Sequence, residues 1–408
     1  IAFLSSATNL DSDVVDENSA VDVFVRDWQS TNPSTVLASR NTSGTGSGNG
    51  ASQTPVLSDN GSILTFESAA TNLVSLFDAN GSSIDVYVFN GTNTGLVSQK
   101  GGGNFTGRST VDVNFSISDT GNWIAFTSNS PGLTNDRYSG QLQIYVRNLS
   151  SGAVELISVN NDGDAGNSGS YRPSISGDGS IVAFDSNATN FNPLASSWWI
   201  SNVFVRDRLT STTRLVSFSG DGTAAGNGTS HSPRISRDGS TIAFLSSATN
   251  LDSDVVDENG ATDAFLRKWR SPSPVTDLIS RGYNGSSSAN GGSVAVTLSE
   301  NGKTVAFTSN GTNHTNLIDA NNTTDVFIVR AATLSVTTSD SSKFEADSGF
   351  TEFTFTIQRE WFTGNEVTVE WTISGLGATP AQPSDFGGSY PNGNVVFAAG
   401  ETVKLVTI

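Results

Sequence analysis

A phenylalanine that recurs about every sixty residues is the feature that most constrains the fold of this chain. It lies in short apolar runs such as Ile-Ala-Phe, and its positions are Phe3, Phe66, Phe126, Phe184, Phe244 and Phe307. The successive gaps are 63, 60, 58, 60 and 63 residues. A repeat of this length with several short strands per copy is typical of stacked or circular β architectures, because one copy cannot bury its own apolar faces.

Two further features keep the same step. A second aromatic recurs at Phe24, Tyr87, Tyr145, Phe204, Phe265 and Phe327. A Ser-x-x-Gly turn precedes five of the six phenylalanines, at 58–61, 118–121, 176–179, 236–239 and 299–302. Four of these turns contain Asp-Gly or Asn-Gly, which suits a tight hairpin. Each unit is therefore predicted to contain four antiparallel strands, with the hairpin turn between the first and the second.

The composition supports an all-β chain and removes several kinds of chemistry. Only 35% of the 408 residues are hydrophobic, Ser, Thr, Asn and Gly are abundant, and no segment shows helical periodicity. The chain has no cysteine and only two histidines, which excludes disulfides, zinc–thiolate sites and cysteine nucleophiles. We predict no catalytic residues from the sequence.

The charge and the ends of the sequence indicate the setting. A net charge of -18 argues against nucleic acid and anionic membrane surfaces as partners, and no run of eighteen apolar residues predicts membrane insertion. The sequence opens inside a repeat and has no Met, so we expect it to be part of a longer protein. The composition favours an extracellular or bacterial cell-surface location, with the periplasm as the alternative.

Loop lengths predict where a binding surface would lie. We call the loop between the second and third strands of a unit the mid-unit loop. The loop from the fourth strand to the first strand of the next unit is the linking loop. Both are long, and in an up-down-up-down sheet both lie on the same face. The first strands are expected at 54–58, 113–118, 172–176 and 232–236, while unit one lacks its first strand and unit six lacks a clear fourth strand.

The Ser-x-Asp-Gly turn, the Ile-Ala-Phe strand and the Asp-x-Phe-Val-Arg-Asp strand resemble the WD40-like (PD40) repeats of TolB-type β-propellers. The resemblance covers residues 1–331 and implies a six-bladed β-propeller with incomplete first and last blades. It is similar in particular to bacterial extracellular variants with long Asp/Asn-rich loops. The resemblance says little about the ligand.

Residues 332–408 lose the sixty-residue period and alternate apolar and polar residues as antiparallel strands do. The segments KFEADSG and PSDFGG resemble a Calx-beta domain, an immunoglobulin-like β-sandwich, whose last two strands are cut off here. In that family's metal-binding members, acidic residues at the positions of Glu345 and Asp385 bind Ca²⁺. Because other acidic ligands are missing, we do not expect a complete site in this segment.

Four mid-unit loops carry oxygen donors two residues apart, followed by another Asp. These residues are Asp16, Asn18, Asp22, Asp78, Asn80, Asp85, Asp257, Asn259, Asp263, Asp319, Asn321 and Asp325. Such a set can surround Ca²⁺, which takes six to eight oxygen ligands. The alternative, which we favour, is that Asp and Asn only shape the loop through their own backbone, because no loop has the full ligand set of an EF-hand.

Trp198 and Trp199 lie in the mid-unit loop of unit four. An aromatic pair there suits stacking on a sugar or a peptide side chain. The alternative, which we favour, is burial against neighbouring loops, as is usual for large aromatics.

Together these features predict a non-enzymatic binding, adhesion or scaffold region of a large exported surface protein. Its acidic long-loop face would meet a protein or glycan partner, with Ca²⁺ stiffening the loops. The alternative is a polysaccharide hydrolase or lyase with a site in the propeller funnel, which requires paired inward carboxylates. The visible Asp residues are instead expected in outer loops and turns.

Overall fold

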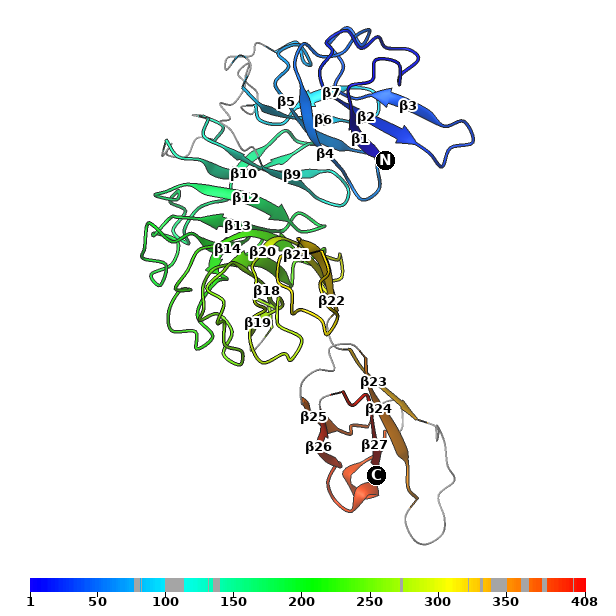
Figure 1. Cartoon of the computed structure of the whole chain (residues 1–408), viewed down its shortest axis with the longest axis vertical. Coiled ribbons are helices and arrows are strands. Elements are labelled where there is room, and N and C mark those ends of the chain that lie inside the picture. The colour runs from blue at the N-terminus through cyan, green and yellow to red at the C-terminus, as the bar shows by residue number, and fades with distance from the viewer. Residues whose placement is uncertain are drawn as a thin grey trace.

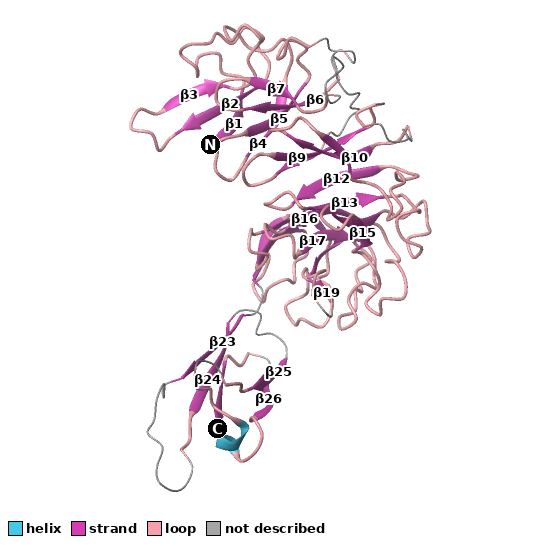
Figure 2. Cartoon of the chain, turned by 180° about the vertical axis from the view of Figure 1, so that it is seen from behind, coloured by secondary structure: helices cyan, strands magenta, loops and turns pink. Residues whose placement is uncertain are grey.

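The computed structural model describes the chain except residues 77–80, 82, 100–113, 131, 135–139, 272–273, 322, 331–332, 339–350, 361–366, 376–379 and 399. The described part is all-β, as predicted, apart from one short 3-10 helix, η1 (Pro383–Phe386) (Figure 2). No helix of this part is long and apolar enough to cross a membrane.

Residues 1–330 form six antiparallel sheets in chain order, one for each predicted unit. The first is β1 (Ala2–Ser5), β2 (Asp22–Asp27) and β3 (Ser34–Leu37). The second and third are β4 (Ser52–Leu57), β5 (Leu64–Ser68), β6 (Asp85–Phe89), β7 (Thr94–Leu96), and β8 (Phe115–Ile117), β9 (Trp123–Ser128), β10 (Gln143–Asn148), β11 (Val154–Leu156). The fourth and fifth are β12 (Ser170–Ile175), β13 (Ile181–Ser186), β14 (Asn202–Asp207), β15 (Thr212–Leu215), and β16 (Ser230–Ile235), β17 (Ile242–Ser246), β18 (Asp263–Arg267), β19 (Thr276–Leu278). The sixth is β20 (Ser293–Leu298), β21 (Thr304–Ser309) and β22 (Asp325–Arg330).

Successive sheets pack side by side in the manner of propeller blades. Figure 1 shows them along an arc, with the first and sixth sheets towards its two ends. The expected closure of the six units into a ring stays a prediction.

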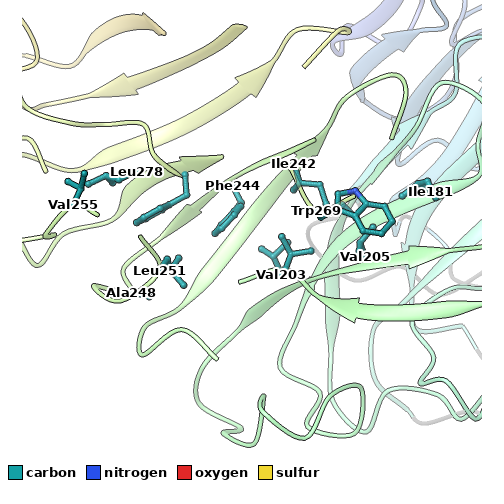
Figure 3. Packing of buried hydrophobic residues seen from close by; sticks show 13 residues of the cluster. Ile181, Val203, Val205, Ile242, Phe244, Ala248, Leu251, Val255, Trp269 and Leu278 are labelled. Atoms are coloured by element: carbon teal, nitrogen blue, oxygen red, sulfur yellow. The ribbon is translucent and has the colours of Figure 1, made fainter. Parts of the chain in front are cut away.

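The repeated aromatics hold each sheet together and fill the space between sheets. Phe244 lies opposite Phe265 in the β17–β18 ladder, and their rings stack with centroids 5.8 Å apart. Figure 3 shows Phe244 and Ile242 in one buried cluster with Val203 and Val205 of the neighbouring sheet. Burial of these side chains supplies the main stabilisation, about 25 cal/mol per Å² of apolar surface.

A repeated asparagine clip joins each linking loop to the following mid-unit loop. The Asn227 side-chain amide donates to Thr249 Oγ1 at 2.9 Å, and the Asn227 Oδ1 accepts the Thr249 backbone N–H at 2.8 Å. The backbone N–H of Asn227 donates to Asn250 Oδ1 at 2.9 Å. The same clip recurs at Asn49, Asn167 and Asn290. In these four units both long loops therefore lie on the same face.

The hairpin turns meet at the opposite end of the sheets. Backbone N–H groups at the second turn position donate to the carbonyl of the next unit at 2.8–3.1 Å. This chain of bonds runs through Asp59, Asp119, Gly177, Arg237 and Glu300. Units two to six are thereby tied together around a common centre.

The C-terminal segment forms two further sheets. One is β23 (Thr333–Thr338), β24 (Thr354–Glu360) and β27 (Val403–Thr407), and the other is β25 (Val367–Thr372) and β26 (Asn392–Phe397). Ile357, Phe397 and Val406 form one small core from both sheets, which suits a sandwich. The identification as a Calx-beta domain stays a prediction.

Candidate functional site

A polar cavity of about 590 Å³ opens between the first strands of units four and five. Tyr171 and Arg172 reach it from β12, Asp185 from β13 and His231 from β16, while Trp199 comes from the mid-unit loop of unit four. Cavities of this size that gather a few polar groups beside aromatic side chains are the usual form of small-ligand sites.

The carboxylate of Asp185 is buried in the wall of this cavity. Its Oδ2 lies 2.9 Å from Arg172 Nη1, and its Oδ1 accepts the Ser232 backbone N–H at 3.2 Å. The Asp185 side chain is 1% exposed, whereas Arg172 is 43% exposed. Burial raises the pKa of Asp185 to about 7, although the nearby Arg172 charge acts in the opposite direction.

A bulge in β12 directs Arg172 into the cavity. The ladder to β13 shifts between Tyr171 and Ser174, and Arg172 has a φ of 51°, which is unusual for a residue other than glycine. Pro173 follows and has no N–H to restore the ladder. Equivalent shifts accompany positive φ at Thr54 and Ser232, each also followed by proline. Strained backbone of this kind is often retained where it aims a functional side chain.

His231 provides a neutral imidazole at the cavity wall. Burial and the Arg172 charge lower the pKa of His231 below its usual value. Its Nδ1 lies 3.0 Å from Ser232 Oγ. The cavity is thus lined by a cation from Arg172, a carboxyl that titrates near neutral pH from Asp185, and an uncharged imidazole from His231.

Trp198 and Trp199 are 51% and 91% exposed. The favoured expectation that they are buried against neighbouring loops is therefore wrong for both. Trp199 lines the cavity, so the loop presents a large aromatic surface beside Asp185. Their role in ligand binding stays a prediction.

A second cavity of about 480 Å³ lies towards the hairpin turns and shares Asn114 and Arg172 with the first. At its end, the Arg237 guanidinium lies 2.5 Å from Asp119, 2.7 Å from Asp59 and 3.1 Å from Glu300. The four charged side chains of this cluster thus come from four different units. We refer to the two cavities together as the funnel, and we call the first cavity, which Trp199 of a mid-unit loop lines, its mouth.

The Asp185 pKa predicts a pH dependence of stability. Its folded pKa of about 7 exceeds the ordinary value of 3.8, so the stability it contributes at low pH is lost as pH rises through 7. Between pH 5 and pH 8, we expect the free energy of unfolding of the wild type to fall by about 1–3 kcal/mol more than that of Asp185→Asn. Urea unfolding at both pH values measures this. Equal changes for the two proteins would contradict the shifted pKa.

The predicted metal residues differ between loops. In unit one, Asp16 and Asp22 are 6% and 0% exposed, and in unit five Asp257 and Asp263 are 8% and 0% exposed. Asn18 and Asn259 cross-link these loops to the linking loops at Gly48 and Ala289. Burial raises the pKa of Asp22 and of Asp263 to about 6. Within the described residues, no place gathers three or more acidic or histidine side chains as a metal site.

Of the remaining candidates, Asp85 is buried, four are solvent-accessible and three lie outside the described residues. Asp319, Asn321 and Asp325 form a turn in which Asp319 Oδ1 accepts the Asn321 backbone N–H at 3.0 Å. Asp385 is exposed and accepts the Gln382 N–H at the start of η1. Asp85 begins β6 and accepts from Ser98. Asp78, Asn80 and Glu345 lie outside the described residues.

Sequence reasoning missed Asp185, Arg172 and His231. The expectation that Asp residues lie only in outer loops and turns is wrong for Asp185, which is within β13. Glu67 occupies the matching position of β5 and accepts from Gln53 and Thr54 at 2.9 and 3.0 Å. The available signal was a carboxylate directly after the repeated phenylalanine, where units three and six have Thr127 and Thr308.

Comparison with known proteins gives structural likeness without a sequence family. No family profile and no curated protein sequence matches this chain. The structure is similar to TolB from Acinetobacter baumannii at 14% identity and a TM-score of 0.40, over 76% of this chain and 57% of TolB. It is also similar to an oligogalacturonate lyase in complex with manganese, at 12% identity and a TM-score of 0.41, over 76% of this chain and 68% of the lyase. An acylaminoacyl peptidase from Pyrococcus horikoshii matches at 11% identity and a TM-score of 0.42, over 83% of this chain and 47% of the peptidase.

These likenesses have TM-scores below 0.5 and carry no inference about a ligand or a reaction. The chain spans a little over half the length of the TolB structure that it matches. The ligand and any reaction must therefore be inferred from the residues of the funnel.

Proposed function

We propose that residues 1–330 form a binding domain that takes a glycan at the mouth of the funnel. The observation that carries this proposal is the convergence of Asp185, Arg172, His231 and Trp199 on one cavity of about 590 Å³. This cavity combines the Asp185–Arg172 ion pair, whose carboxylate is buried, with the exposed ring of Trp199.

The chemistry of these groups suits sugars. A carboxyl and a guanidinium 2.9 Å apart present acceptors and donors together, which matches the neighbouring hydroxyls of a pyranose ring. The 91% exposed ring of Trp199 offers a flat apolar surface for the C–H face of the same sugar. An apolar ligand would leave the buried Asp185 and its partners unpaired, which costs binding free energy.

The setting that we propose is a larger exported surface protein of adhesion or scaffold type. The net charge of -18 argues against nucleic acid and anionic membranes as partners. The acidic, Asn- and Thr-rich composition is what favours an extracellular location. The charge also favours uncharged or cationic glycans over polyanionic ones.

A glycan array probed with the full chain at pH 7.5 tests the proposal, followed by titration calorimetry with the best binder. Trp199→Ala is expected to weaken binding about tenfold or more, because one aromatic contact in an open site contributes about 1–2 kcal/mol. Asp185→Asn is expected to weaken it about ten- to a hundredfold, since it removes a charge-assisted acceptor. Trp28→Ala is the matched control, because Trp28 is 59% exposed but does not line the funnel cavities.

Two outcomes would contradict a glycan site at the funnel mouth. One is an array without any binder under conditions in which the protein is folded. The other is a binder whose affinity is unchanged in both Trp199→Ala and Asp185→Asn. Capture of a protein instead of a glycan, with the same two variants inactive, would favour a protein ligand at this cavity.

A polysaccharide hydrolase or lyase is the second candidate, and Asp185 is the observation that favours it. A carboxyl with a pKa of about 7 beside Arg172 can exchange a proton near neutral pH. Glycoside hydrolysis needs a second carboxyl about 5–10 Å away. New reducing ends released from the bound glycan by the wild type, but not by Asp185→Asn, would establish the enzyme and replace the binding role.

A further inference from the structure

We propose that the mid-unit loops of units one and five each hold one Ca²⁺ ion, bound by Asp16 with Asp22 and by Asp257 with Asp263. These sites lie in the long loops, apart from the Asp185 cavity. The calcium proposal therefore does not depend on the proposal of glycan binding.

The first site is built from two buried carboxylates in unit one. Asp22 Oδ1 accepts the Ser39 hydroxyl at 2.6 Å, and Asp16 Oδ1 lies 3.3 Å from the Asn18 backbone N–H. The second oxygen of Asp16, Oδ2, is buried and has no hydrogen-bond partner among the described residues, whereas the Asn18 side chain also interacts with Asp22. Asp16 is close enough that its charge contributes to the raised pKa of Asp22.

Unit five repeats this arrangement at a distance of 241 residues along the chain. Asp263 Oδ1 accepts the Ser280 hydroxyl at 2.6 Å, and Asp257 Oδ1 lies 3.3 Å from the Asn259 N–H. Asp257 Oδ2 is again buried without a partner in the described part of the chain. Asp263 Oδ2 accepts the Asn259 side-chain amide at 2.8 Å. The loops of units one and five thus share a buried, unpartnered oxygen on the first carboxylate, as the identical sequences of residues 1–18 and 242–259 lead one to expect.

The surroundings hold both loops firmly in place. Val15 pairs with Gly46 and Val256 pairs with Ser287, which attaches each mid-unit loop to the adjacent linking loop. Ser47 and Ser288 accept the N–H groups of Glu17 and Glu258 at 3.1 and 3.0 Å. Pre-ordered loops reduce the entropic cost of binding an ion.

Two adjacent buried carboxylates require a counter-charge or a proton. An unpaired buried charge is strongly unfavourable, and a buried oxygen without a partner loses its hydration. A hard cation with all-oxygen ligands meets both needs, and Ca²⁺ accepts irregular coordination completed by backbone carbonyls and water. A proton shared by the pair is the competing solution.

The mid-unit loop of unit six has the same residue types, but its carboxylates are not buried. Asp319 and Asp325 are partly exposed rather than buried, and Asn321 bonds to both of them at 3.0 and 3.3 Å. Among the candidate loops that the structure describes in full, we therefore assign ions to those of units one and five. Calcium stoichiometry then distinguishes this assignment from a general affinity of acidic loops.

Calorimetric titration of the EDTA-treated full chain with CaCl₂ at pH 7.5 tests the proposal. We expect two ions per chain, one ion for Asp16→Asn or Asp257→Asn, and none for the double variant. Asp13→Asn and Asp254→Asn are matched controls, because these residues are exposed in the same loops, and both should retain two ions. Saturating Ca²⁺ should also raise Tm by about 5 °C relative to EDTA, and this rise should be lost in the double variant.

Absence of heat together with an unchanged Tm in Ca²⁺ and EDTA would overturn the proposal in favour of a shared proton. Ca²⁺ binding that the double variant retains would equally overturn it, because the ions would then lie elsewhere. Circular dichroism of each variant separates loss of an ion from loss of the fold. Glycan binding by the Asp16→Asn, Asp257→Asn double variant distinguishes failure of these sites from failure of the funnel proposal.

Discussion

Phe184→Ala is expected to lower the free energy of unfolding by about 3–5 kcal/mol, the usual cost of removing a buried aromatic ring. The Phe184 side chain is 0% exposed. It stacks on Phe204 with ring centroids 6.0 Å apart and meets Phe191 edge-on at 5.9 Å. The alanine would leave a cavity in a cluster that includes residues of the third and fourth sheets, such as Ile144 and Val182.

Urea unfolding followed by tryptophan fluorescence measures this effect. Leu209→Ala is the control, because Leu209 is 81% exposed and its loss should change stability by less than about 0.5 kcal/mol. A loss below about 1.5 kcal/mol for Phe184→Ala would mean that the repeated phenylalanine does not carry the packing between sheets.

Gly228→Ala is expected to lower the free energy of unfolding by about 2–4 kcal/mol. The added Cβ would force the linking loop before unit five away from the mid-unit loop of unit five. A Cβ at this position would lie 2.5 Å from the backbone carbonyl carbon and oxygen of Ser247. Backbone atoms cannot rotate away as a side chain can, so the loops themselves must move. Gly50 makes the equivalent approach to Ala69 at 2.8 Å in unit two, whereas unit four has Ser168 at this position.

Thermal unfolding checks the effect of this substitution against Gly282→Ala. The nearest atom to a Cβ at Gly282 is the Asn313 side-chain amide at 3.3 Å, which can shift. Because β16 begins two residues after Gly228 and carries His231, we also expect weaker ligand binding for Gly228→Ala. Equal stability of the two variants would argue against rigid clamping of the loops.

The repeat predicted most of the fold, because its determinants are local. Phe244 and Phe265 lie opposite each other in adjacent strands, as the constant spacing requires. The Asp-Gly turns occur at the predicted hairpins, with Gly179 and Gly239 at φ values of 76° and 69°. The first strands begin two residues earlier than expected in units two, four and five, because bulges at Thr54, Arg172 and Ser232 extend the pairing beyond the prolines.

The candidate site was harder to predict, because it forms between units. Asp185 and Arg172 are thirteen residues apart, and their approach depends on a bulge that has no simple sequence signature. His231 reaches the same cavity from the next sheet. The acidic loops of units one and six share residue types, yet Asp22 is buried and Asp325 is partly exposed. This difference depends on how the adjacent loops pack, which the residue types do not indicate.

Hydrogen–deuterium exchange of the full chain with and without its bound glycan tests most directly whether the funnel mouth is the binding site. We predict slower exchange in 170–175, 187–201 and 229–235, which frame the cavity around Asp185. The hairpin turns around Arg237 and strand β22 should exchange at unchanged rates. Protection confined to those turns or to β22, with none at the Asp185 cavity, would contradict the account.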